Sequence, residues 1–294
     1  MHRRQIIDYL VLAVIWGLSF LLILKVVHAF GWVGAVTFRS LTASGVLLLI
    51  ALAVRRQLAF GRWWPLALVG ATTVAGQLMG LSIATPLIGT AMTAIFVGTI
   101  PLFSMLIGHV WGIERITTWG RVGLVLGFLG VVLLVGFPAT PVTGGFVLGC
   151  ACSVFASVSA AFGSNYARRH LQAIGSWEQT IGAFFVGGAL MLPMLAVVPV
   201  PGRPAPVDYA YLVLLAVMCS AVAYVLYFRL VAEAGATVAI SVEFLVTVIA
   251  VVVGAVLLGE RLSLLQLAGG AVIIAGCSLV VGLVPGRTRV LTGR

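Results

Sequence analysis

Glu243 is a carboxylate within the apolar run AISVEFLVTV, residues 239–248. It lies about eight residues into the predicted helix 236–258, where an acid facing lipid would cost at least a few kcal/mol. Its side chain should therefore face the protein interior or a water-filled cavity. Two interpretations are open. Glu243 either pairs with Arg39 or with Ser and Thr hydroxyls and holds helices together, or it meets an ammonium group or carries a proton.

Arg39 is the other charge deep inside an apolar segment, about seven residues into the predicted helix 32–54. The structural interpretation is favoured for this residue: the long side chain extends toward the membrane surface or meets the C-terminal end of a helix. The alternative is that its guanidinium binds a carboxylate.

The composition indicates the environment in which these charges lie. Only 8% of the 294 residues are charged, 62% are hydrophobic and the mean hydropathy is +1.22, whereas soluble domains have about 25% charged residues. A soluble chain of this length would have to hide nearly every residue, so a membrane protein is predicted. The four cysteines lie in apolar segments and are interpreted as packing residues. No metal site or cofactor is expected.

A bilayer core about 30 Å thick needs about 20 apolar residues per helix. The sequence therefore predicts an all-α membrane protein with ten transmembrane helices, at residues 6–26, 32–54, 64–84, 88–110, 119–137, 144–167, 177–199, 208–230, 236–258 and 264–284. The first apolar segment is too long for the apolar region of a signal peptide and has no convincing cleavage site, so it is predicted to be a retained helix.

The net charge of +10 comes mostly from arginines in the short gaps between apolar segments, which indicates membrane topology rather than nucleic-acid binding. Assigning the gaps alternately to two sides gives 13 basic residues against 3, with Arg39 counted for neither. The larger group is expected in the cytoplasm together with both termini: Arg3, Arg4, Arg55, Arg56, Arg62, Arg115, Arg121, Arg168, Arg169, Arg229, Arg287, Arg289 and Arg294. The smaller group comprises Lys25, Arg203 and Arg261.

A shift of 146 residues aligns Glu114-Arg115 with Glu260-Arg261, because 260 − 114 = 146. The same shift aligns five glycine pairs: Gly89 with Gly235, Gly108 with Gly254, Gly123 with Gly269, Gly130 with Gly276 and Gly136 with Gly282. Two repeats of five helices are predicted, at residues 1–142 and 143–294. Because five is odd, the second repeat must cross the membrane inverted. Many secondary transporters have inverted repeats, which move around a site in the middle of the bilayer.

Four segments resemble the drug/metabolite transporter superfamily and its ten-helix EamA-type members: IWGLSF at 15–20, FRSLTASG at 38–45, TIPLFSMLIGHVWGIER at 99–115 and VEFLVTVIAVVVGAVLLGER at 242–261. Within the superfamily, the chain is most similar to the bacterial aromatic amino-acid exporters. The resemblance implies that helices 1, 3, 4, 6, 8 and 9 surround a central cavity, with helices 5 and 10 at the periphery. Phe244 replaces a proline of many relatives, so a kink at this position is not implied.

The resemblance adds further candidate residues, because it places helices with polar or aromatic side chains at the cavity. Gln77 is costly in lipid and should face inward, and the depth of Trp16 suits a cavity wall or gate. For Phe96, Tyr224 and Tyr227, packing and a substrate-facing role are equally open. Asn165 could cap a helix or line an exit. The predicted substrate-binding residues are thus Trp16, Ser19, Gln77, Phe96, Tyr224, Tyr227 and Glu243, with Arg39 and Asn165 in structural or gating roles.

The function that these features predict is export of small metabolites by alternating access across the bacterial cytoplasmic membrane. Amino acids, aromatic and other neutral ones, are the preferred substrates, and drugs or other metabolites are the alternative. The chain has one lysine and no GxxxxGK[ST] motif, which excludes an ATPase within it. An intramembrane enzyme using Ser19 and His109 is disfavoured, as are a scaffold and a channel. The lipid bilayer and a small molecule are the expected partners, nucleic acid is not, and a monomer could function.

Overall fold

The computed structural model describes residues 3–112, 116–136, 141–234 and 236–281. Every regular element within these ranges is a helix. Eight of the helices are long and apolar enough to cross a membrane by length and composition, and a further apolar helix, Leu264–Val280, is shorter. The prediction of an all-α membrane protein is therefore confirmed. The paired residues Glu114, Arg115, Gly235 and Gly282 lie outside the described residues.

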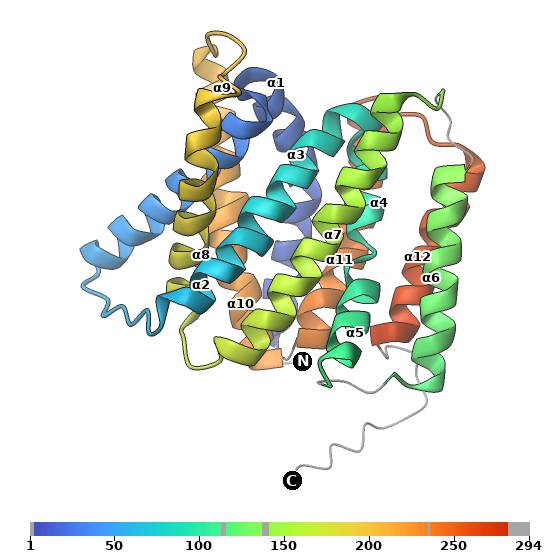
Figure 1. The fold of residues 1–294 in the computed structure, drawn as a ribbon, viewed down its shortest axis with the longest axis horizontal. Helices are drawn as coiled ribbons and strands as arrows, with labels where there is room; N and C mark the ends of the chain where they lie inside the picture. Colours follow the sequence, from blue (N-terminus) through green and yellow to red (C-terminus); the bar gives the residue numbers. More distant parts are fainter. Residues whose placement is uncertain (1–2, 113–115, 137–140, 235, 282–294) are drawn as a thin grey trace.

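The first element, α1 (Arg3–Ala53), contains both of the first two predicted helices, 6–26 and 32–54. A straight helix of this length would measure about 75 Å, far more than a bilayer core of about 30 Å. The helix breaks at Gly31, whose φ of 69° and ψ of 168° are not helical. Figure 1 shows the chain rising from the N-terminus to this break and then descending. A Cβ at Gly31 would also lie 3.2 Å from Cδ of Pro201.

Two of the next three predicted helices contain irregularities. The helix predicted at 64–84 consists of an α-helix, a π-helix and another α-helix, and the helix predicted at 88–110 is interrupted at Gly98 and Thr99, whereas the helix predicted at 119–137 corresponds to one uninterrupted α-helix. The elements are α2 (Trp63–Val69), η1 (Gly70–Gly76), α3 (Gln77–Ile88), α4 (Thr90–Val97), α5 (Ile100–Val110) and α6 (Thr118–Gly136).

In the second part of the chain the helices follow the predicted order, and some of them are again irregular. The helix predicted at 208–230 also contains a π-helix, which the hydropathy pattern did not indicate. The elements are α7 (Gly144–His170), α8 (Ser176–Met191), η2 (Leu192–Ala196), α9 (Pro206–Ala216), η3 (Val217–Val222), α10 (Ala223–Ala234), α11 (Ala236–Leu257) and α12 (Leu264–Val281).

Helices α6 and α12 lie side by side at one edge of the bundle (Figure 1). Their backbones approach closely at glycines. A Cβ on Gly130 would lie 2.7 Å from the carbonyl oxygen of Gly269, and a Cβ on Gly276 would lie 2.6 Å from that of Gly123. Small residues of this kind allow helices in a membrane to pack closely without a hydrophobic driving force between them.

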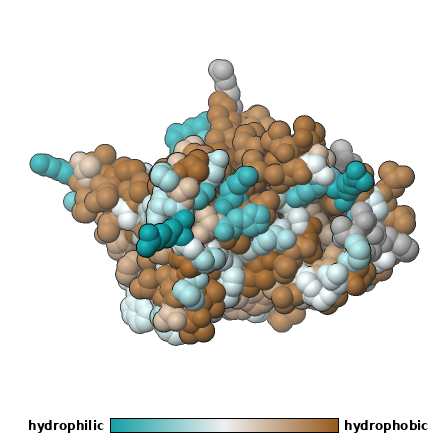
Figure 2. Space-filling view, turned by 90° about the horizontal axis from the view of Figure 1, so that it is seen from above, coloured by the Kyte–Doolittle hydropathy of each residue, from teal (hydrophilic) through white to brown (hydrophobic). Residues whose placement is uncertain are grey.

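The outer surface is mostly hydrophobic, as a lipid environment requires. In a view along the bundle, brown hydrophobic residues dominate the rim, and hydrophilic residues lie mostly in a band across the middle (Figure 2). Large apolar side chains of α6 are exposed on its outer face: Val122, Val125, Leu129 and Val132. The polar residues that the sequence places within helices must therefore be sought inside the bundle.

Glu260 joins the end of α11 to the beginning of α4. Its Oε1 accepts hydrogen bonds from the backbone N–H (2.6 Å) and the hydroxyl (2.9 Å) of Thr90, and its Oε2 accepts one from the N–H of Ala91 (2.8 Å). A Cβ at Gly89 or Gly254 would lie 3.1 Å or 2.6 Å from this carboxylate, which explains the glycine at both positions. A residue 170 positions away in sequence thus caps α4.

Replacing Glu260 by Gln should lower the free energy of unfolding by about 1–2 kcal/mol, because an amide carries no charge toward the helix N-terminus and presents a donor to one N–H group. The thermal unfolding midpoint of the detergent-solubilised protein measures this effect. The matched control is Glu233→Gln, which neutralises an exposed carboxylate of α10. Equal midpoints for the two variants would contradict the capping role.

Candidate functional site

A small cavity of about 40 Å³ lies where α1, α3, α4, α10 and α11 meet. We call it the central cavity. Six of the nine residues singled out from the sequence line it: Trp16, Ser19, Arg39, Gln77, Tyr224 and Glu243. The remaining lining residues are Phe20, Ile23, Leu78, Leu81, Val97 and Val246. The fold therefore gathers polar residues from helices far apart in sequence around one space.

Glu243 lies on α11 with its side chain toward the central cavity, and the residue is 8% exposed. Its backbone carbonyl accepts a hydrogen bond from the hydroxyl of Thr247 at 2.8 Å. Among the residues that the structure describes, none forms a hydrogen bond or an ion pair with its carboxylate. The interpretation of Glu243 as the partner of Arg39 is therefore wrong, and the carboxylate is an acceptor turned toward the cavity.

Arg39 is 4% exposed and reaches across the bundle to η3 rather than to the membrane surface. Its Nε donates to the hydroxyl of Ser220 at 2.5 Å, and its Nη2 donates to the carbonyl of Cys219 at 3.4 Å. Neither expected arrangement, an extended side chain at the surface or one at a helix end, describes this contact. The guanidinium is instead held inside the bundle by neutral groups.

The π-helix η3 provides these neutral acceptors. A π-helix bonds residue i to residue i+5, so it displaces the regular i to i+4 pattern and frequently occurs at functional sites. The carbonyl of Cys219 accepts from the indole N–H of Trp16 at 3.2 Å as well as from Arg39. The hydroxyl of Ser220 donates to the carbonyl of Leu215 at 3.3 Å. One irregular turn thus fixes both Arg39 and Trp16.

Gln77 is the first residue of α3 and directly follows the other π-helix, η1. It is 9% exposed and lines the central cavity. Its side-chain amide has no hydrogen-bond partner within the described part of the chain. Ser19 lies on α1 and also lines the cavity, and its hydroxyl donates to the carbonyl of Trp16 at 2.7 Å. Gln77 and Glu243 therefore line this cavity without a hydrogen-bond partner among the described residues, and both can bind another molecule.

Aromatic rings form one wall of the central cavity. The ring of Trp16 lies 5.4 Å from that of Tyr224 and 5.4 Å from that of Tyr227, measured between centroids. Tyr224 also packs edge-on against Phe184 at 4.8 Å. Aromatic pairs at such distances attract one another beyond the burial of their area. The wall therefore has an apolar face with few polar edges.

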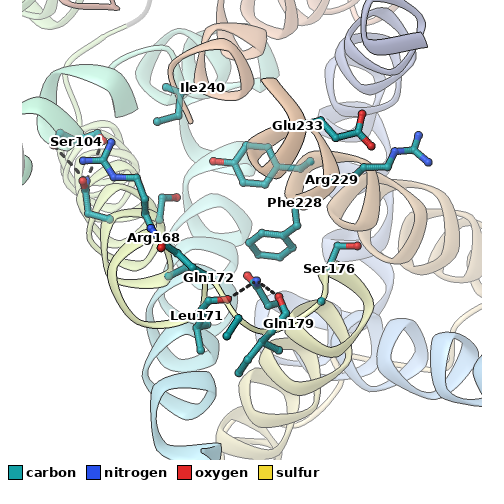
Figure 3. A pocket seen from close by; sticks show the side chains of 17 residues that line it. Ser104, Arg168, Leu171, Gln172, Ser176, Gln179, Phe228, Arg229, Glu233 and Ile240 are labelled. Carbon is teal, nitrogen blue, oxygen red and sulfur yellow. Dashed lines mark hydrogen bonds between the residues drawn. The ribbon is translucent and has the colours of Figure 1, made fainter. Parts of the chain in front are cut away.

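A second cavity, of about 690 Å³, lies beyond this wall at the end of the bundle where α7 connects to α8. We call it the large cavity. Figure 3 shows Phe228 projecting toward the middle of its lining, whereas the guanidinium of Arg229 and the carboxylate of Glu233 point away to one side. Its lining also includes Tyr227, Asn165, Ser104, Ser164, Arg168, Gln172, Ser176, Gln179 and Ile240.

Asn165 and Phe96 occupy structural positions. The Nδ2 group of Asn165 donates to the hydroxyl of Ser104 at 2.8 Å and to the carbonyl of Ala161 at 2.9 Å, which links α7 to α5. Phe96 is 0% exposed, lines neither cavity and belongs to an apolar cluster with Met92, Ile95 and others. The backbone carbonyl of Phe96 accepts a hydrogen bond from Ser157 of α7.

The structure does not assemble a catalytic pair from Ser19 and His109. Ser19 lines the central cavity, whereas His109 is exposed near the end of α5 and lines neither cavity. An ion pair that the sequence reasoning missed joins Asp8 of α1 to Arg229 of α10 at 2.5 Å. The depth argument applied to Glu243 gave no signal for Asp8, because Asp8 is only the third residue of the predicted helix 6–26.

The arrangement of long apolar helices around an internal polar cavity defines a multi-pass membrane protein. The model of the EamA-like transporter family matches residues 5–136 and 147–282, and the chain belongs to this family. Proteins described as the uncharacterized inner membrane transporter YedA, from Escherichia coli strains K12, O6:H1 and O157:H7, are each 29% identical over 196 residues. The match covers 66% of this chain and 62% of each relative.

A solved crystal structure, described only as that of a protein, has the same fold. Its TM-score is 0.71 at 16% sequence identity, and the match covers 98% of this chain and 100% of the other. The description of this family is that of transporters. The resemblance to transporters found in the sequence is thereby confirmed at the level of the family.

Replacing Ser220 by Ala should destabilise the fold by about 1–3 kcal/mol, because the buried guanidinium of Arg39 would lose its short hydrogen bond. Thermal unfolding of the purified variant provides the measurement. Ser278→Ala is the matched control, since within the described part of the chain the hydroxyl of Ser278 bonds only to the carbonyl of Ile274 in its own helix. If both variants unfold at the temperature of the parent protein, the hydrogen bond between Arg39 and Ser220 does not contribute this much to stability.

Proposed function

We propose that the protein is a secondary transporter that exports neutral amino acids, aromatic ones included, from the cytoplasm by alternating access. The observation that carries the proposal is the central cavity, in which the unpartnered carboxylate of Glu243 and the guanidinium of Arg39 stand beside an aromatic wall. An amino acid offers an ammonium for the first, a carboxylate for the second and a side chain for the wall.

The proposed architecture has ten crossings. The two arms of α1 on either side of Gly31 count as two, and α12 counts as one in spite of its shorter apolar segment. With the seven other candidate helices, 2 + 1 + 7 = 10. The repeats 1–142 and 143–294 would then contain five crossings each, and the family model matches the chain once in each of them.

One feature of the structure supports the repeats, and a second supports their inverted relation. First, the π-helices η1 and η3 end at Gly76 and Val222, and 222 − 76 = 146, the shift that aligns the glycine pairs. Second, α6 and α12 make crosswise contacts, Gly123 with Gly276 and Gly130 with Gly269. A two-fold axis that exchanges Gly123 with Gly269 and Gly130 with Gly276 converts one contact into the other.

The proposed orientation puts the large cavity on the cytoplasmic side. Arg168, from the basic group assigned to the cytoplasm, lines this cavity, and Arg169 follows it. The description of YedA as an inner membrane transporter supports the same membrane. An exporter takes up its substrate from the cytoplasm, and a cavity on that side is where the substrate would first enter.

Export of drugs or other metabolites is a second candidate function. The observation that favours it is the volume of the large cavity, about 690 Å³, which is in the range of pockets that hold drug-sized molecules. The two candidates differ in which molecules cross the membrane.

Purified protein in liposomes tests the proposal directly. Liposomes are loaded with a panel of labelled amino acids, nucleosides and cationic drugs, and release is followed with and without a pH gradient. We expect phenylalanine and other neutral amino acids to leave faster than from protein-free liposomes. Release of a drug without release of any amino acid would contradict the amino-acid proposal and favour the second candidate.

Replacing Glu243 by Gln should weaken binding of ammonium-bearing ligands by about tenfold, because an ion pair in the central cavity becomes a neutral contact. Competition against labelled phenylalanine measures this with two analogues. Phenethylamine, which has no carboxylate, should lose affinity, whereas 3-phenylpropionate, which has no ammonium, should not. Glu233→Gln, outside the central cavity, is the control. Equal losses for both analogues would argue against contact between Glu243 and the ammonium.

A further inference from the structure

The central and large cavities are separated by about one helical turn. On α10, Tyr224 lines the central cavity and Tyr227 lines the large one. On α11, Glu243 lines the central cavity and Ile240 the large one. Residues three positions apart on an α-helix are separated by about 4.5 Å along its axis. The material between the two spaces is therefore a single layer of side chains.

The volumes of the cavities require this layer to move if a solute is to reach the inner one. The central cavity measures about 40 Å³, which is room for a few water molecules at most, because one water molecule needs about 10–15 Å³ of cavity volume. The large cavity, at about 690 Å³, lies within the usual range for bound small molecules. A substrate can occupy the large cavity as it stands, but the polar groups around Glu243 become reachable only after a wall has shifted.

The layer consists of aromatic rings. The ring centroid of Tyr227 lies 5.4 Å from that of Trp16, 6.4 Å from that of Tyr224 and 5.6 Å from that of Phe228. Tyr227 thus contacts every other ring of the layer and borders the large cavity itself. Such rings close a passage tightly, yet a side-chain rotation can separate them without breaking backbone hydrogen bonds.

Tyr227 is the ring of this layer that is best placed to move. The indole of Trp16 is held by its hydrogen bond to the carbonyl of Cys219, and Tyr224 is buried against Phe184. Tyr227 is only partly buried and borders the open space of the large cavity. Rotation of this one ring away from Trp16 would join the two cavities.

We propose that Tyr227 is a gate between the large cavity and the central cavity, and that it sets the size of the molecules that pass. The proposal rests on the proposed function in one respect: the molecules are the amino acids for which the central cavity is suited. The gate itself follows from the geometry of the rings. It can be tested without any substrate.

Accessibility of a cysteine placed behind the gate provides the test. In a background in which Cys150, Cys152, Cys219 and Cys277 are replaced by Ala, Gln77→Cys puts a thiol in the central cavity. A small charged thiol reagent is added to the purified full-length protein, and modification is followed by intact mass. Tyr227→Ala should speed modification at least about tenfold, because the packed ring that closes the passage is removed.

Matched variants separate the ring from other effects. Tyr227→Phe keeps the ring and should be modified about as slowly as the parent. Ile240→Ala removes a side chain from the large cavity without touching the aromatic layer, and it too should leave the rate unchanged. Gln172→Cys, at an exposed position of the large cavity, should react quickly in every background and establishes that the reagent enters there.

Several results would overturn the gate. An unchanged modification rate of Gln77→Cys in the Tyr227→Ala background would be one such result. A rate raised as much by Ile240→Ala as by Tyr227→Ala would be another. Rapid modification of Tyr227→Phe would also reject the ring as the barrier. Val97→Cys, a second position in the central cavity, repeats the test if Gln77→Cys fails to fold.

Transport in liposomes separates the gate from the proposed function. Tyr227→Ala should raise the rate for tryptophan relative to alanine, because a wider passage favours the larger molecule. Faster thiol modification together with no movement of any amino acid would reject the proposed function and retain the gate. An unchanged modification rate in a protein that exports phenylalanine would reject the gate and retain the proposed function.

Discussion

A polar group inside a bilayer has to find its partner within the protein, because lipid offers none, and the interior of this bundle follows from that constraint. Arg39 lies against Ser220 and a carbonyl, Asn165 holds α5 to α7, and the carboxylate of Glu260 caps α4. Each contact joins helices that are distant in sequence, so satisfying polar groups and fixing the arrangement of helices are the same process. Glu243 and Gln77 are informative exceptions, since their side chains line a cavity without a hydrogen-bond partner among the described residues.

Irregular helical turns create the acceptors that these side chains need. A regular α-helix uses its carbonyls internally and leaves few for a neighbouring helix. The π-helix η3 leaves the carbonyl of Cys219 able to accept from both Trp16 and Arg39. The other π-helix, η1, directly precedes Gln77 in α3. Both irregular turns thus lie beside the central cavity, and the local cost of distorting a helix is offset by the polar side chains that it orients.

The two ends of the bundle are closed in different ways. At one end, Glu260 binds the first two residues of α4 through both carboxylate oxygens. Toward the other end lies the large cavity, bounded on its inner side by Tyr227 and Phe228. The ion pair of Asp8 with Arg229 ties α1 to α10 beside it. One end of the bundle is therefore held by hydrogen bonds to a helix end, whereas the inner side of the large cavity at the other end is bounded by aromatic side chains.

The sequence by itself determined the class of protein, the order of the helices and the family, because hydropathy and residue spacing are properties of each segment. It also singled out most of the polar residues that line the central cavity, since a buried polar side chain is costly wherever it lies in an apolar run. Only the tertiary structure decided their partners. Arg39 and Glu243 were open to pairing by depth alone, yet a π-helix that no hydropathy pattern reveals offered Arg39 a nearer acceptor. Which group lies within hydrogen-bond distance depends on how helices far apart in the chain pack, and that is set by the whole bundle.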